Sequence, residues 1–336
     1  MTTAIIRPAS RKDLDQLESM ISRVDPGMLT MPSSREAMSA RIERSLKAFS
    51  RGSLPPENEC YFLVMEEDGE LLGTASIFTN LGVERPFYSY RISRDSKVSP
   101  EQGVKAELDL LFLVNDYHGD TELGTLFIER KARGGGRGRL LSFARLMLIA
   151  VDPVRFGPKA MAEIRGYTDP QGRSPFWDAV GSKFFHMDYR KADVLSARDH
   201  RFIADLMPRY PIYVALLPDE ARSVIARPHP DAEPALAMLK SQGFRYNDVV
   251  DIFDAGPTVE AFIDHIDTVR EAVRMSAAEF SGGDLRAPAG LIARASVTDF
   301  AVTQYTRGED PAAVLKRIGA AGHDEVLVYR LKEKRA

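Results

Sequence analysis

The pattern of apolar and polar residues predicts strands and helices along the first half of the chain. Apolar residues recur at helical spacing from Ser10 to Val24 and again from Ser33 to Phe49, which predicts two helices. Between two apolar runs, Glu67-Asp68-Gly69 is a strong hairpin signal, because aspartate and glycine accept the left-handed backbone of a tight turn. Strands are predicted at the short apolar runs Ala4 to Pro8, Tyr61 to Met65, Leu71 to Thr79, Ala106 to Val114 and Glu122 to Ile128.

The rest of the chain continues this mixture of elements. A helix from Arg139 to Val151, a strand from Ala160 to Arg165 and a helix beginning at Pro175 follow one another. Large apolar residues stand four positions before Gly181 and before Gly243, and both glycines are predicted to end a helix in the left-handed conformation. This recurrence indicates either a degenerate second copy of one folding unit or a chance likeness between two helix ends.

The composition narrows the class of protein. The 336 residues carry a formal net charge of −3, which disfavours a protein that coats nucleic acid. Cys60 is the single cysteine, so the chain can form neither an internal disulfide nor a cysteine-based metal cluster. Residues Met1 to Arg11 hold no apolar run long enough for a signal peptide, and no later run approaches the roughly 20 apolar residues of a membrane span. We therefore expect a cytoplasmic protein that binds neither nucleic acid nor a membrane.

The most specific local feature is the arginine-glycine segment that links the Glu122 to Ile128 run to the helix at Arg139. Its sequence is Arg133-Gly134-Gly135-Gly136-Arg137-Gly138. Glycines let backbone N–H groups approach an anion closely, arginines add charge, and the helix contributes the positive end of its dipole. A flexible turn or a nucleic-acid contact has a similar composition, but ordered elements on both sides favour a pyrophosphate site.

The spacing separates this loop from other phosphate-binding loops. Gly138 is followed by Arg139 rather than by the Lys-Ser/Thr of a P-loop, and Leu141 stands where the dinucleotide fingerprint needs glycine. Instead the loop looks like the pantetheine-pyrophosphate loop of the GNAT acyltransferase superfamily. This resemblance implies an α+β, GNAT-like fold at residues 1–190 and a second GNAT-like domain at residues 191–336 that completes the active site. It implies that CoA is bound by Leu126, Phe127, Arg133, Gly134, Gly136, Arg137 and Gly138.

A wider set of motifs, in order over most of the chain, resembles one family, the arginine N-succinyltransferases. The resemblance implies transfer of a succinyl group from succinyl-CoA to the α-amino group of L-arginine, which gives N2-succinyl-L-arginine and CoA in arginine catabolism. It also implies no bound cofactor, no metal, and a homodimer or an oligomer of paired subunits. The matching segments are Glu122-Leu123-Gly124-Thr125-Leu126-Phe127, Glu163-Ile164-Arg165-Gly166, Ser174-Pro175-Phe176-Trp177, Phe202-Ile203-Ala204-Asp205-Leu206-Met207-Pro208, His229-Pro230, Gly243-Phe244-Arg245-Tyr246 and Asp251-Ile252-Phe253-Asp254-Ala255-Gly256-Pro257.

Two residues take roles from this resemblance. Leu126 falls where the strand of the family contacts succinyl-CoA, and His229 matches the proton donor of the family. A departing thiolate needs a proton, Phe176-Trp177 stands where many GNAT enzymes carry a tyrosine, and imidazole titrates near neutral pH. Pro228 and Pro230 hold His229 outside a helix. An inert histidine in a proline-rich surface loop is the alternative interpretation.

The charged ends of the two substrates predict further site residues. Carboxylates need cations, for which the candidates are Arg91, Arg165 and Arg173, and a guanidinium needs carboxylates, for which they are Asp116, Glu122 and Glu163. Surface ion pairs are the commoner fate of such residues. The chain departs from the family at Asn115 to Gly119 and at Ser196 to Arg201. Ornithine or another amine as the acceptor, and a non-catalytic CoA-binding partner subunit, therefore remain as alternatives.

Overall fold

The computed structural model describes residues 3–21, 31–32, 34–196, 201–208, 210–282 and 289–332. The chain divides into two compact units, each assembled from separated stretches of sequence. Unit 1 contains residues 1–80, 121–160 and 261–336, and unit 2 contains residues 81–120 and 161–260. The linear division at residue 190, and with it the second GNAT-like domain, stays a prediction.

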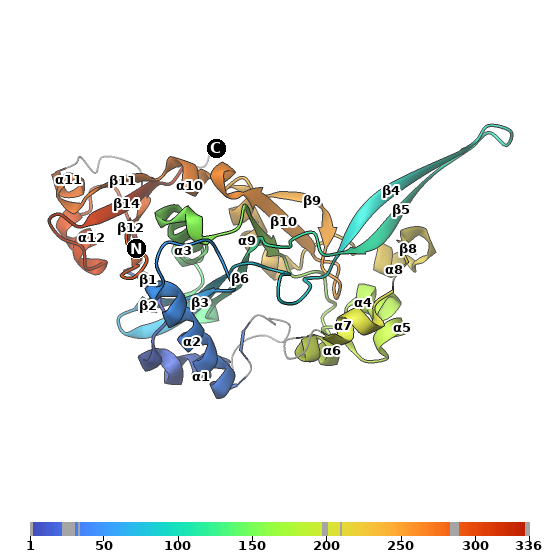
Figure 1. Ribbon diagram of the computed structural model, residues 1–336, viewed down its shortest axis with the longest axis horizontal. Helices are drawn as coiled ribbons and strands as arrows, with labels where there is room; N and C mark the ends of the chain where they lie inside the picture. The colour runs from blue at the N-terminus through green and yellow to red at the C-terminus, as the bar shows by residue number, and fades with distance from the viewer. Residues whose placement is uncertain are drawn as a thin grey trace. The chain divides into compact units, whose positions relative to one another are not determined.

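Unit 1 is built on an antiparallel sheet with the strand order β11-β14-β12-β13-β1-β2-β3-β6 (Figure 1). The first strand pairs on one side with the segment after the first helices and on the other with the C-terminal region, since Ile5 lies opposite both Glu66 and Thr303. The C-terminal strands therefore extend the sheet that the first strand begins. Their bounds are β1 (Ile5–Pro8), β2 (Cys60–Glu67), β3 (Glu70–Phe78), β6 (Thr121–Ile128), β11 (Val273–Ser276), β12 (Gly290–Arg294), β13 (Val302–Tyr305) and β14 (Glu325–Arg330).

The hairpin predicted between β2 and β3 is confirmed. Asp68 and Gly69 have φ angles of 52° and 81°, and Glu67 lies opposite Glu70. Two consecutive left-handed residues form the turn whose twist matches that of two antiparallel strands.

The helices of unit 1 pack on its sheet through apolar side chains. Met38 and Ile42 of α2 join Phe62 and Val64 of β2 in one buried cluster. The Ser45 hydroxyl accepts the N–H of Phe62 at 2.9 Å, which ties α2 to the strand beneath it. The predicted helices at Ser33 to Phe49 and Arg139 to Val151 are confirmed; residues 22–24 of the first predicted helix lie outside the described residues. The helices are α1 (Leu14–Ile21), α2 (Arg35–Ser50), α3 (Arg137–Val151), α10 (Asp267–Glu271), α11 (Ala277–Gly282) and α12 (Pro311–Arg317), with 3-10 turns η1 (Arg11–Asp13), η2 (Arg130–Ala132), η3 (Pro153–Arg155) and η6 (Ile263–His265).

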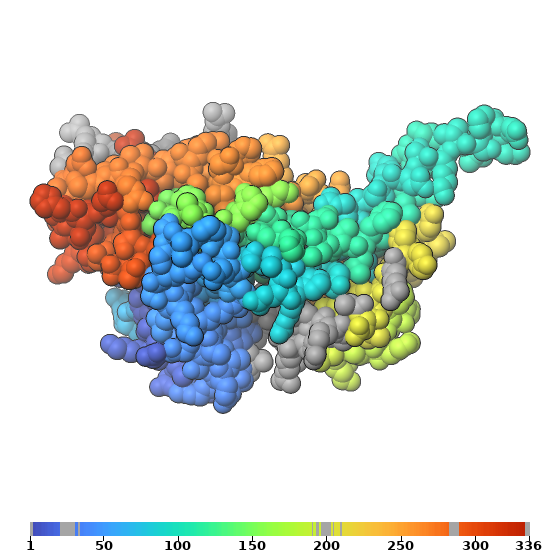
Figure 2. Space-filling view, in the orientation of Figure 1, coloured from blue at the N-terminus to red at the C-terminus, as the bar shows by residue number. Residues whose placement is uncertain are grey.

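Unit 2 contains a second set of strands, in the order β7-β10-β9-β4-β5-β8. Its longest element is the β4–β5 hairpin, in which Ser89 lies opposite Val114 and Ser99 opposite Val104. The tip of this hairpin stands clear of neighbouring atoms in Figure 2. Apolar periodicity missed β4 because its outer part is a run of serine and charged residues. The strands are β4 (Ser89–Ser99), β5 (Val104–Val114), β7 (Lys159–Glu163), β8 (Ile212–Tyr213), β9 (Arg245–Val250) and β10 (Pro257–Phe262).

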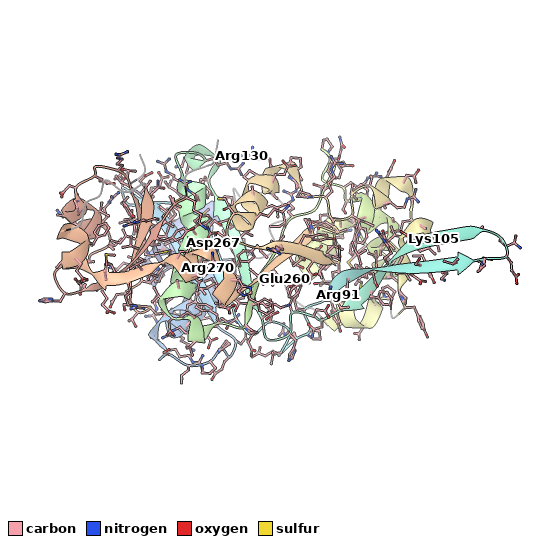
Figure 3. All side chains as sticks on the ribbon, turned by 90° about the horizontal axis from the view of Figure 1, so that it is seen from above. Arg91, Lys105, Arg130, Glu260, Asp267 and Arg270 are labelled. Carbon is pink, nitrogen blue, oxygen red and sulfur yellow. The ribbon has the colours of Figure 1, made fainter. Side chains whose placement is uncertain are left out.

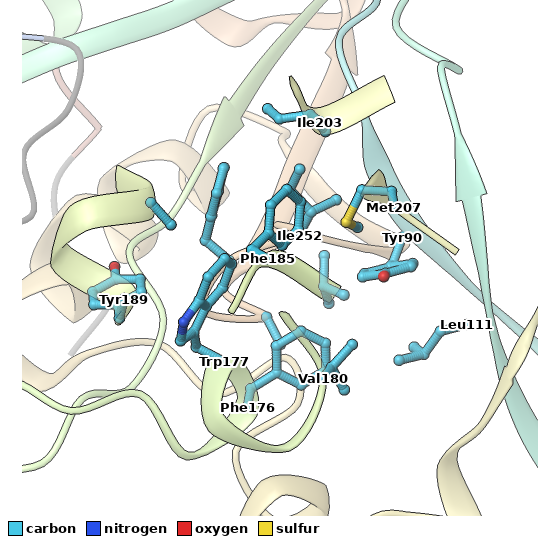
Figure 4. Close-up of a cluster of buried hydrophobic side chains, with 14 of the residues drawn as sticks. Tyr90, Leu111, Phe176, Trp177, Val180, Phe185, Tyr189, Ile203, Met207 and Ile252 are labelled. Carbon is cyan, nitrogen blue, oxygen red and sulfur yellow. The ribbon is translucent and has the colours of Figure 1, made fainter. Parts of the chain in front are cut away.

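An aromatic core joins the short helices of unit 2 to its sheet (Figure 4). The ring of Trp177 is fully buried and stacks on Phe185 and Phe253, with ring centroids 5.3 and 5.5 Å away. Its indole N–H donates to the carbonyl of Met187 at 3.0 Å, so the polar edge of the ring is satisfied as well. The helices are α4 (Pro175–Ala179), α5 (Gly181–Phe185), α6 (Tyr189–Ser196), α7 (Arg201–Leu206), α8 (Asp219–Arg222) and α9 (Glu233–Lys240), with 3-10 turns η4 (Val214–Leu216) and η5 (Pro230–Ala232).

Of the two predicted helix-ending glycines, one is confirmed and one is wrong. Gly243 follows α9 with a φ of 95°, as predicted. Gly181 begins α5 instead of adopting a left-handed conformation, and its role is steric. A Cβ at Gly181 would lie 2.2 Å from the ring of Trp177, so the absence of a side chain lets the indole pack against the backbone.

Candidate active site

The glycine loop of unit 1 joins a strand to the buried helix α3. Gly134, Gly135 and Gly136 have φ angles of 103°, 59° and 84°, a run of left-handed backbone that residues with a Cβ rarely adopt. The N–H of Arg137 donates to the Gly134 carbonyl at 3.2 Å, which closes the turn. Among the described residues, no acceptor is seen for the N–H groups of Gly135, Gly136 and Gly138. The loop therefore presents unpaired donors at the positive end of a fifteen-residue helix, as an anion site requires.

The arginines around this loop differ in what they can do. The Arg133 side chain is exposed, whereas the Arg137 guanidinium donates to Glu67 with bonds of 2.6 and 3.0 Å. Arg139, in the first turn of α3, has its Nε buried without a hydrogen-bond partner, and so does the Oε1 of Gln304 beside Gly136. Gln304 was not predicted as a site residue, because it lies far away in the chain and reaches the loop through β13.

A β-bulge interrupts β6 just before the loop. Thr74 lies opposite Phe127 and Ser76 opposite Gly124, so the register shifts between them, and Thr125 has a φ of 51°. A left-handed φ at a β-branched residue is an outlier that the surrounding structure must hold in place. The Thr125 hydroxyl lies 3.4 Å from a guanidinium nitrogen of Arg41. Bulges re-aim strand backbone, and this one falls where Leu126 was predicted to contact the acyl donor. Thr125 was noticed only as part of the matching segment Glu122 to Phe127, and its left-handed backbone was not predicted.

Glu122, at the start of β6, is buried in a field of two cations. Burial raises the pKa of its carboxyl to about 7, against the opposing attraction of Arg41 and Arg145. Burial likewise lowers the pKa of Arg145 to about 10. No hydrogen bond to the Glu122 carboxyl is seen in the described parts of the chain. A carboxyl that already faces two guanidinium groups is poorly placed to receive a third from a substrate, and its pKa suits it to exchange a proton near neutral pH.

His229 of unit 2 is held by backbone pairing and by its own side chain. Its N–H donates to the carbonyl of Arg165 at 2.8 Å, and the N–H of Tyr167 donates to the carbonyl of Arg227 at 3.1 Å. The His229 Nδ1 accepts the N–H of Asp231 at 3.1 Å as the N-cap of η5. With Nδ1 used as an acceptor, the proton of the neutral imidazole lies on Nε2. The side chain is 18% exposed.

The segment that carries His229 lies against a buried carboxylate. The Asp254 carboxylate accepts the N–H groups of Gly166 and Gly256, both at 2.8 Å. Arg165 precedes Gly166, and its Nε is buried without a hydrogen-bond partner while one terminal nitrogen lies 3.4 Å from the Thr168 hydroxyl. Two predicted residues, Arg165 and His229, are thus brought together by the fold. The role of Asp254 was missed, although its motif had been noticed as part of the family resemblance.

Three other predicted arginines and acids form ion pairs or flank a tyrosine. Arg91 donates to Asp116 at 2.6 Å, so the predicted carboxylate binder and the predicted guanidinium binder pair with each other. Figure 3 shows Arg91 at the base of the β4–β5 hairpin and Lys105 towards its tip. Glu163 is half-buried, and burial, together with the charges of Glu260 and Glu163, raises the pKa of Tyr117.

The last predicted cation, Arg173, lies in a surface ion network. Its guanidinium is 56% exposed and lies 3.3 to 3.5 Å from Asp169, Asp178 and Glu220.

One of the two segments in which the chain departs from the family is Ser196 to Arg201, and residues 197–200 of it lie outside the described residues. No helix in the described part of the chain is both long enough and apolar enough to span a membrane.

Comparison with known proteins places these features in a family. The family model for the arginine N-succinyltransferase beta subunit matches residues 4–268. The chain is 41% identical over 282 residues to the arginine N-succinyltransferase subunit beta of Pseudomonas aeruginosa, covering 83% of each chain. It is 39% identical over 301 residues to the arginine N-succinyltransferase of Escherichia coli, covering 89% of this chain and 87% of that one.

A solved structure supports the same conclusion. The arginine/ornithine succinyltransferase subunit AI of P. aeruginosa superposes with a TM-score of 0.86, at 27% identity, over 99% of this chain and 100% of that one. The predicted α+β fold class and the predicted family are confirmed. The chain belongs to the arginine N-succinyltransferase family.

Proposed function

We propose that the protein transfers the succinyl group of succinyl-CoA to the α-amino group of L-arginine, releasing CoA and N2-succinyl-L-arginine. The observation that carries the proposal is membership of the family, over four fifths of the chain at 41% identity to a named arginine N-succinyltransferase subunit. The glycine loop supports it, since donors at a helix N-terminus suit the pyrophosphate of CoA. The predicted CoA contacts at Leu126, Phe127, Arg133, Gly134, Gly136, Arg137 and Gly138 stay proposals.

The reaction begins when the neutral amine attacks the thioester carbonyl. A C–N bond forms, the carbonyl oxygen becomes an oxyanion, and the nitrogen must lose a proton. The bulge at Thr125 re-aims the backbone of Leu126 and Phe127, so we assign oxyanion stabilisation to N–H groups there. We assign proton acceptance to Glu122, directly or through water, because its pKa of about 7 suits a general base.

The intermediate then collapses with cleavage of the C–S bond. The thiolate of CoA leaves and takes up a proton, for which we propose His229. Its Nδ1 accepts the N–H of Asp231, so the proton of the neutral ring lies on Nε2, to which we assign the role of donor. Arg165 beside it is the proposed partner for a substrate carboxylate, because its buried Nε has no hydrogen-bond partner. The substrate roles of Arg91, Arg173, Asp116 and Glu163 stay weaker proposals, because ion pairs or nearby polar groups occupy most of them.

Two alternatives keep support from the names of the relatives. The structural relative of P. aeruginosa is named an arginine/ornithine succinyltransferase, which favours ornithine as a second acceptor. It is also named a subunit, as is the curated relative from the same organism. A paired-subunit oligomer, in which this chain binds CoA without catalysing transfer, is therefore the second candidate. The alternative of a homodimer, and a cytoplasmic location, likewise stay predictions.

The test measures release of the CoA thiol from succinyl-CoA and acetyl-CoA, each with arginine, ornithine or lysine, and identifies the product by mass spectrometry. Release with succinyl-CoA and arginine is expected, and His229→Ala should lower kcat by about 100-fold, the usual contribution of a general acid. His323→Ala is the matched control, since His323 is exposed. CoA binding without release from any pair would overturn the enzyme assignment and favour the silent subunit.

A further inference from the structure

We propose that Asp254 is a positioning residue, which fixes the Arg165-Gly166 segment on which the His229 loop is mounted. The inference rests on the proposed function, in which His229 donates a proton. It goes further by assigning to a buried carboxylate the task of holding the donor and the neighbouring cation in register.

The carboxylate of Asp254 is buried and joins two segments of the chain. Asp254 is 5% exposed, and its two oxygens accept N–H groups from two separate segments, Gly166 and Gly256. A third group, the Tyr189 hydroxyl, lies 3.5 Å away. A buried carboxylate that accepts backbone N–H bonds is held rigidly and in turn holds its donors.

Backbone hydrogen bonds connect the segment around Gly166 to His229. Gly166 forms an isolated bridge with Pro228, and the residues on either side of it complete a short antiparallel ladder. The His229 N–H donates to the Arg165 carbonyl, and the Tyr167 N–H to the Arg227 carbonyl. A displacement of Gly166 would therefore be passed to the backbone of His229 and Arg227, through one hydrogen bond to each.

The backbone at Gly166 and at Gly256 packs closely against neighbouring segments. A Cβ on Gly166 would lie 2.5 Å from the Asp254 carbonyl and carboxylate oxygens, and a Cβ on Gly256 would lie 2.1 Å from the Ile164 carbonyl. Both distances are far below an ordinary contact, so the two glycines let three segments meet around one carboxylate. The Ala226 N–H adds a bond to the Ala255 carbonyl at 2.9 Å, which ties the His229 loop to the same place.

A second carboxyl, Asp251, completes the arrangement. Its Oδ1 accepts the N–H groups of Phe253 at 2.7 Å and Asp254 at 2.8 Å. Burial raises the pKa of both carboxyls, and that of Asp251 rises well above its ordinary value because the charge of Asp254 adds to burial. The interaction between the two side chains raises the pKa of Asp251 and lowers that of Asp254, the direction expected when Asp251 is the proton donor of the pair. In the described part of the chain, Arg165 and the Tyr189 hydroxyl also face the pair.

The arrangement also accounts for Arg165. The charge of Arg165 lowers the pKa of Asp254 against burial, so the two groups attract each other. Its terminal nitrogen reaches Thr168, while its Nε remains unpartnered. The charge of Asp254 thus attracts the guanidinium, while the Nε of Arg165 remains as a donor for a substrate carboxylate.

The experiment compares Asp254→Asn with Asp251→Asn in the full-length protein. An asparagine at 254 places its N–H₂ group against one of the two backbone donors, whereas an asparagine at 251 reproduces both the acceptor and the donor of a protonated acid. Asp254→Asn should lower kcat/KM for the amino acid by about 10- to 100-fold, with the affinity for CoA unchanged. Asp251→Asn should keep the wild-type rate, and it should remove the fall in kcat that is expected in wild type once the pH is high enough to ionise Asp251.

Amide hydrogen exchange gives a readout that does not depend on activity. The Gly166 and His229 N–H groups should exchange faster in Asp254→Asn than in wild type, and at the wild-type rate in Asp251→Asn. Inactivity of wild type with every substrate pair would overturn the proposed function. The amide exchange rates of Gly166 and His229 would still decide whether Asp254 positions this segment. If Asp254→Asn does not fold, the protection factor of the Gly166 N–H, which corrects for the intrinsic rise of exchange with pH, takes its place: it should fall at high pH in wild type and stay constant in Asp251→Asn. A folded Asp254→Asn with wild-type kcat and wild-type exchange would overturn the inference.

Discussion

Each unit buries a carboxyl next to arginine, Glu122 in unit 1 and Asp254 in unit 2, and the hydrogen bonding of the two carboxyls differs. Glu122 of unit 1 faces Arg41 and Arg145 only through space, and burial holds its pKa near 7. Asp254 of unit 2 accepts two backbone N–H bonds at 2.8 Å, and burial raises the pKa of both Asp254 and its neighbour Asp251. Backbone donors make the second carboxylate a fixed part of the fold, whereas their absence leaves the first able to change its protonation state.

The same contrast extends to the rest of each unit. In unit 1 the candidate chemistry is carried by backbone, in the left-handed glycines and the bulge of β6. In unit 2 it is carried by two side chains, those of Arg165 and His229, mounted on a ladder that a buried carboxylate supports. Backbone donors need local strain to be exposed, while side-chain donors need a supporting layer of hydrogen bonds. Substitutions in each unit therefore test whether its candidate site depends on backbone strain or on supporting hydrogen bonds.

The largest expected effect concerns Glu122, which should make the stability of the protein depend on pH. Its ordinary pKa of 4.5 is raised to about 7 in the folded state, so between these values the folded chain holds a proton that the unfolded chain releases. Wild type should therefore lose on the order of 3 kcal/mol of unfolding free energy as the pH rises through this window. Glu122→Gln cannot titrate and should not show this loss.

The measurement is urea unfolding of both proteins from pH 4.5 to 8.5. The difference in unfolding free energy should grow in favour of Glu122→Gln as the pH rises, then level off above pH 7. Glu101→Gln is the control, because Glu101 is exposed and should give a constant difference. A flat difference for Glu122→Gln would show that its carboxyl ionises as an ordinary glutamate, and would end its assignment as the base.

The sequence contained enough information for much of unit 1. Helical spacing located α2 and α3, an Asp-Gly pair located the β2–β3 turn, and a glycine run located the loop before α3. All these signals are local, since each depends on residues a few positions apart. The strand β4 was missed because it is stabilised by pairing along its whole length with β5, which a polar sequence does not reveal.

The candidate site of unit 2 shows that local sequence signals do not predict contacts between residues far apart in the chain. His229 and Arg165 were both singled out, yet nothing in the sequence joined them, because a backbone bond links residues 64 positions apart. Asp254 was seen only as part of a matching motif, since a buried carboxylate between two glycines has no local pattern of its own. Gly181 was misassigned for a similar reason: the ring of Trp177, rather than the helix end, requires its missing side chain.

The next effect in size tests the backbone site of unit 1. Gly136 has a φ of 84°, and a Cβ there would lie 3.0 Å from the Oε1 of Gln304. Gly136→Val should therefore distort the loop, because a β-branched residue in this region costs roughly 1 to 3 kcal/mol. The affinity for CoA should fall about 100-fold, equivalent to about 2.7 kcal/mol, in isothermal titration calorimetry. Gly103→Val is the matched control, since Gly103 has a φ of 62° in the open turn of the β4–β5 hairpin. Equal CoA affinity in the two variants would mean that the left-handed glycines do not form the pyrophosphate site.

The smallest expected effect separates a surface ion pair from a substrate contact. Arg91 and Asp116 lie 2.6 Å apart with side chains 34% and 39% exposed, so water screens much of their attraction. A double-mutant cycle with Arg91→Met and Asp116→Asn should give a coupling of about 0.5 kcal/mol in unfolding free energy. The same four proteins should be assayed for the KM of arginine. If the pair is only structural, Arg91→Met and Asp116→Asn should change KM equally little. A rise in KM with Arg91→Met alone would mean that Arg91 leaves Asp116 to bind a substrate carboxylate, and would place a second side-chain contact in unit 2 beside Arg165. A rise with Asp116→Asn alone would assign the acid to the guanidinium instead, because the carboxylate would then matter to the substrate more than to its arginine neighbour.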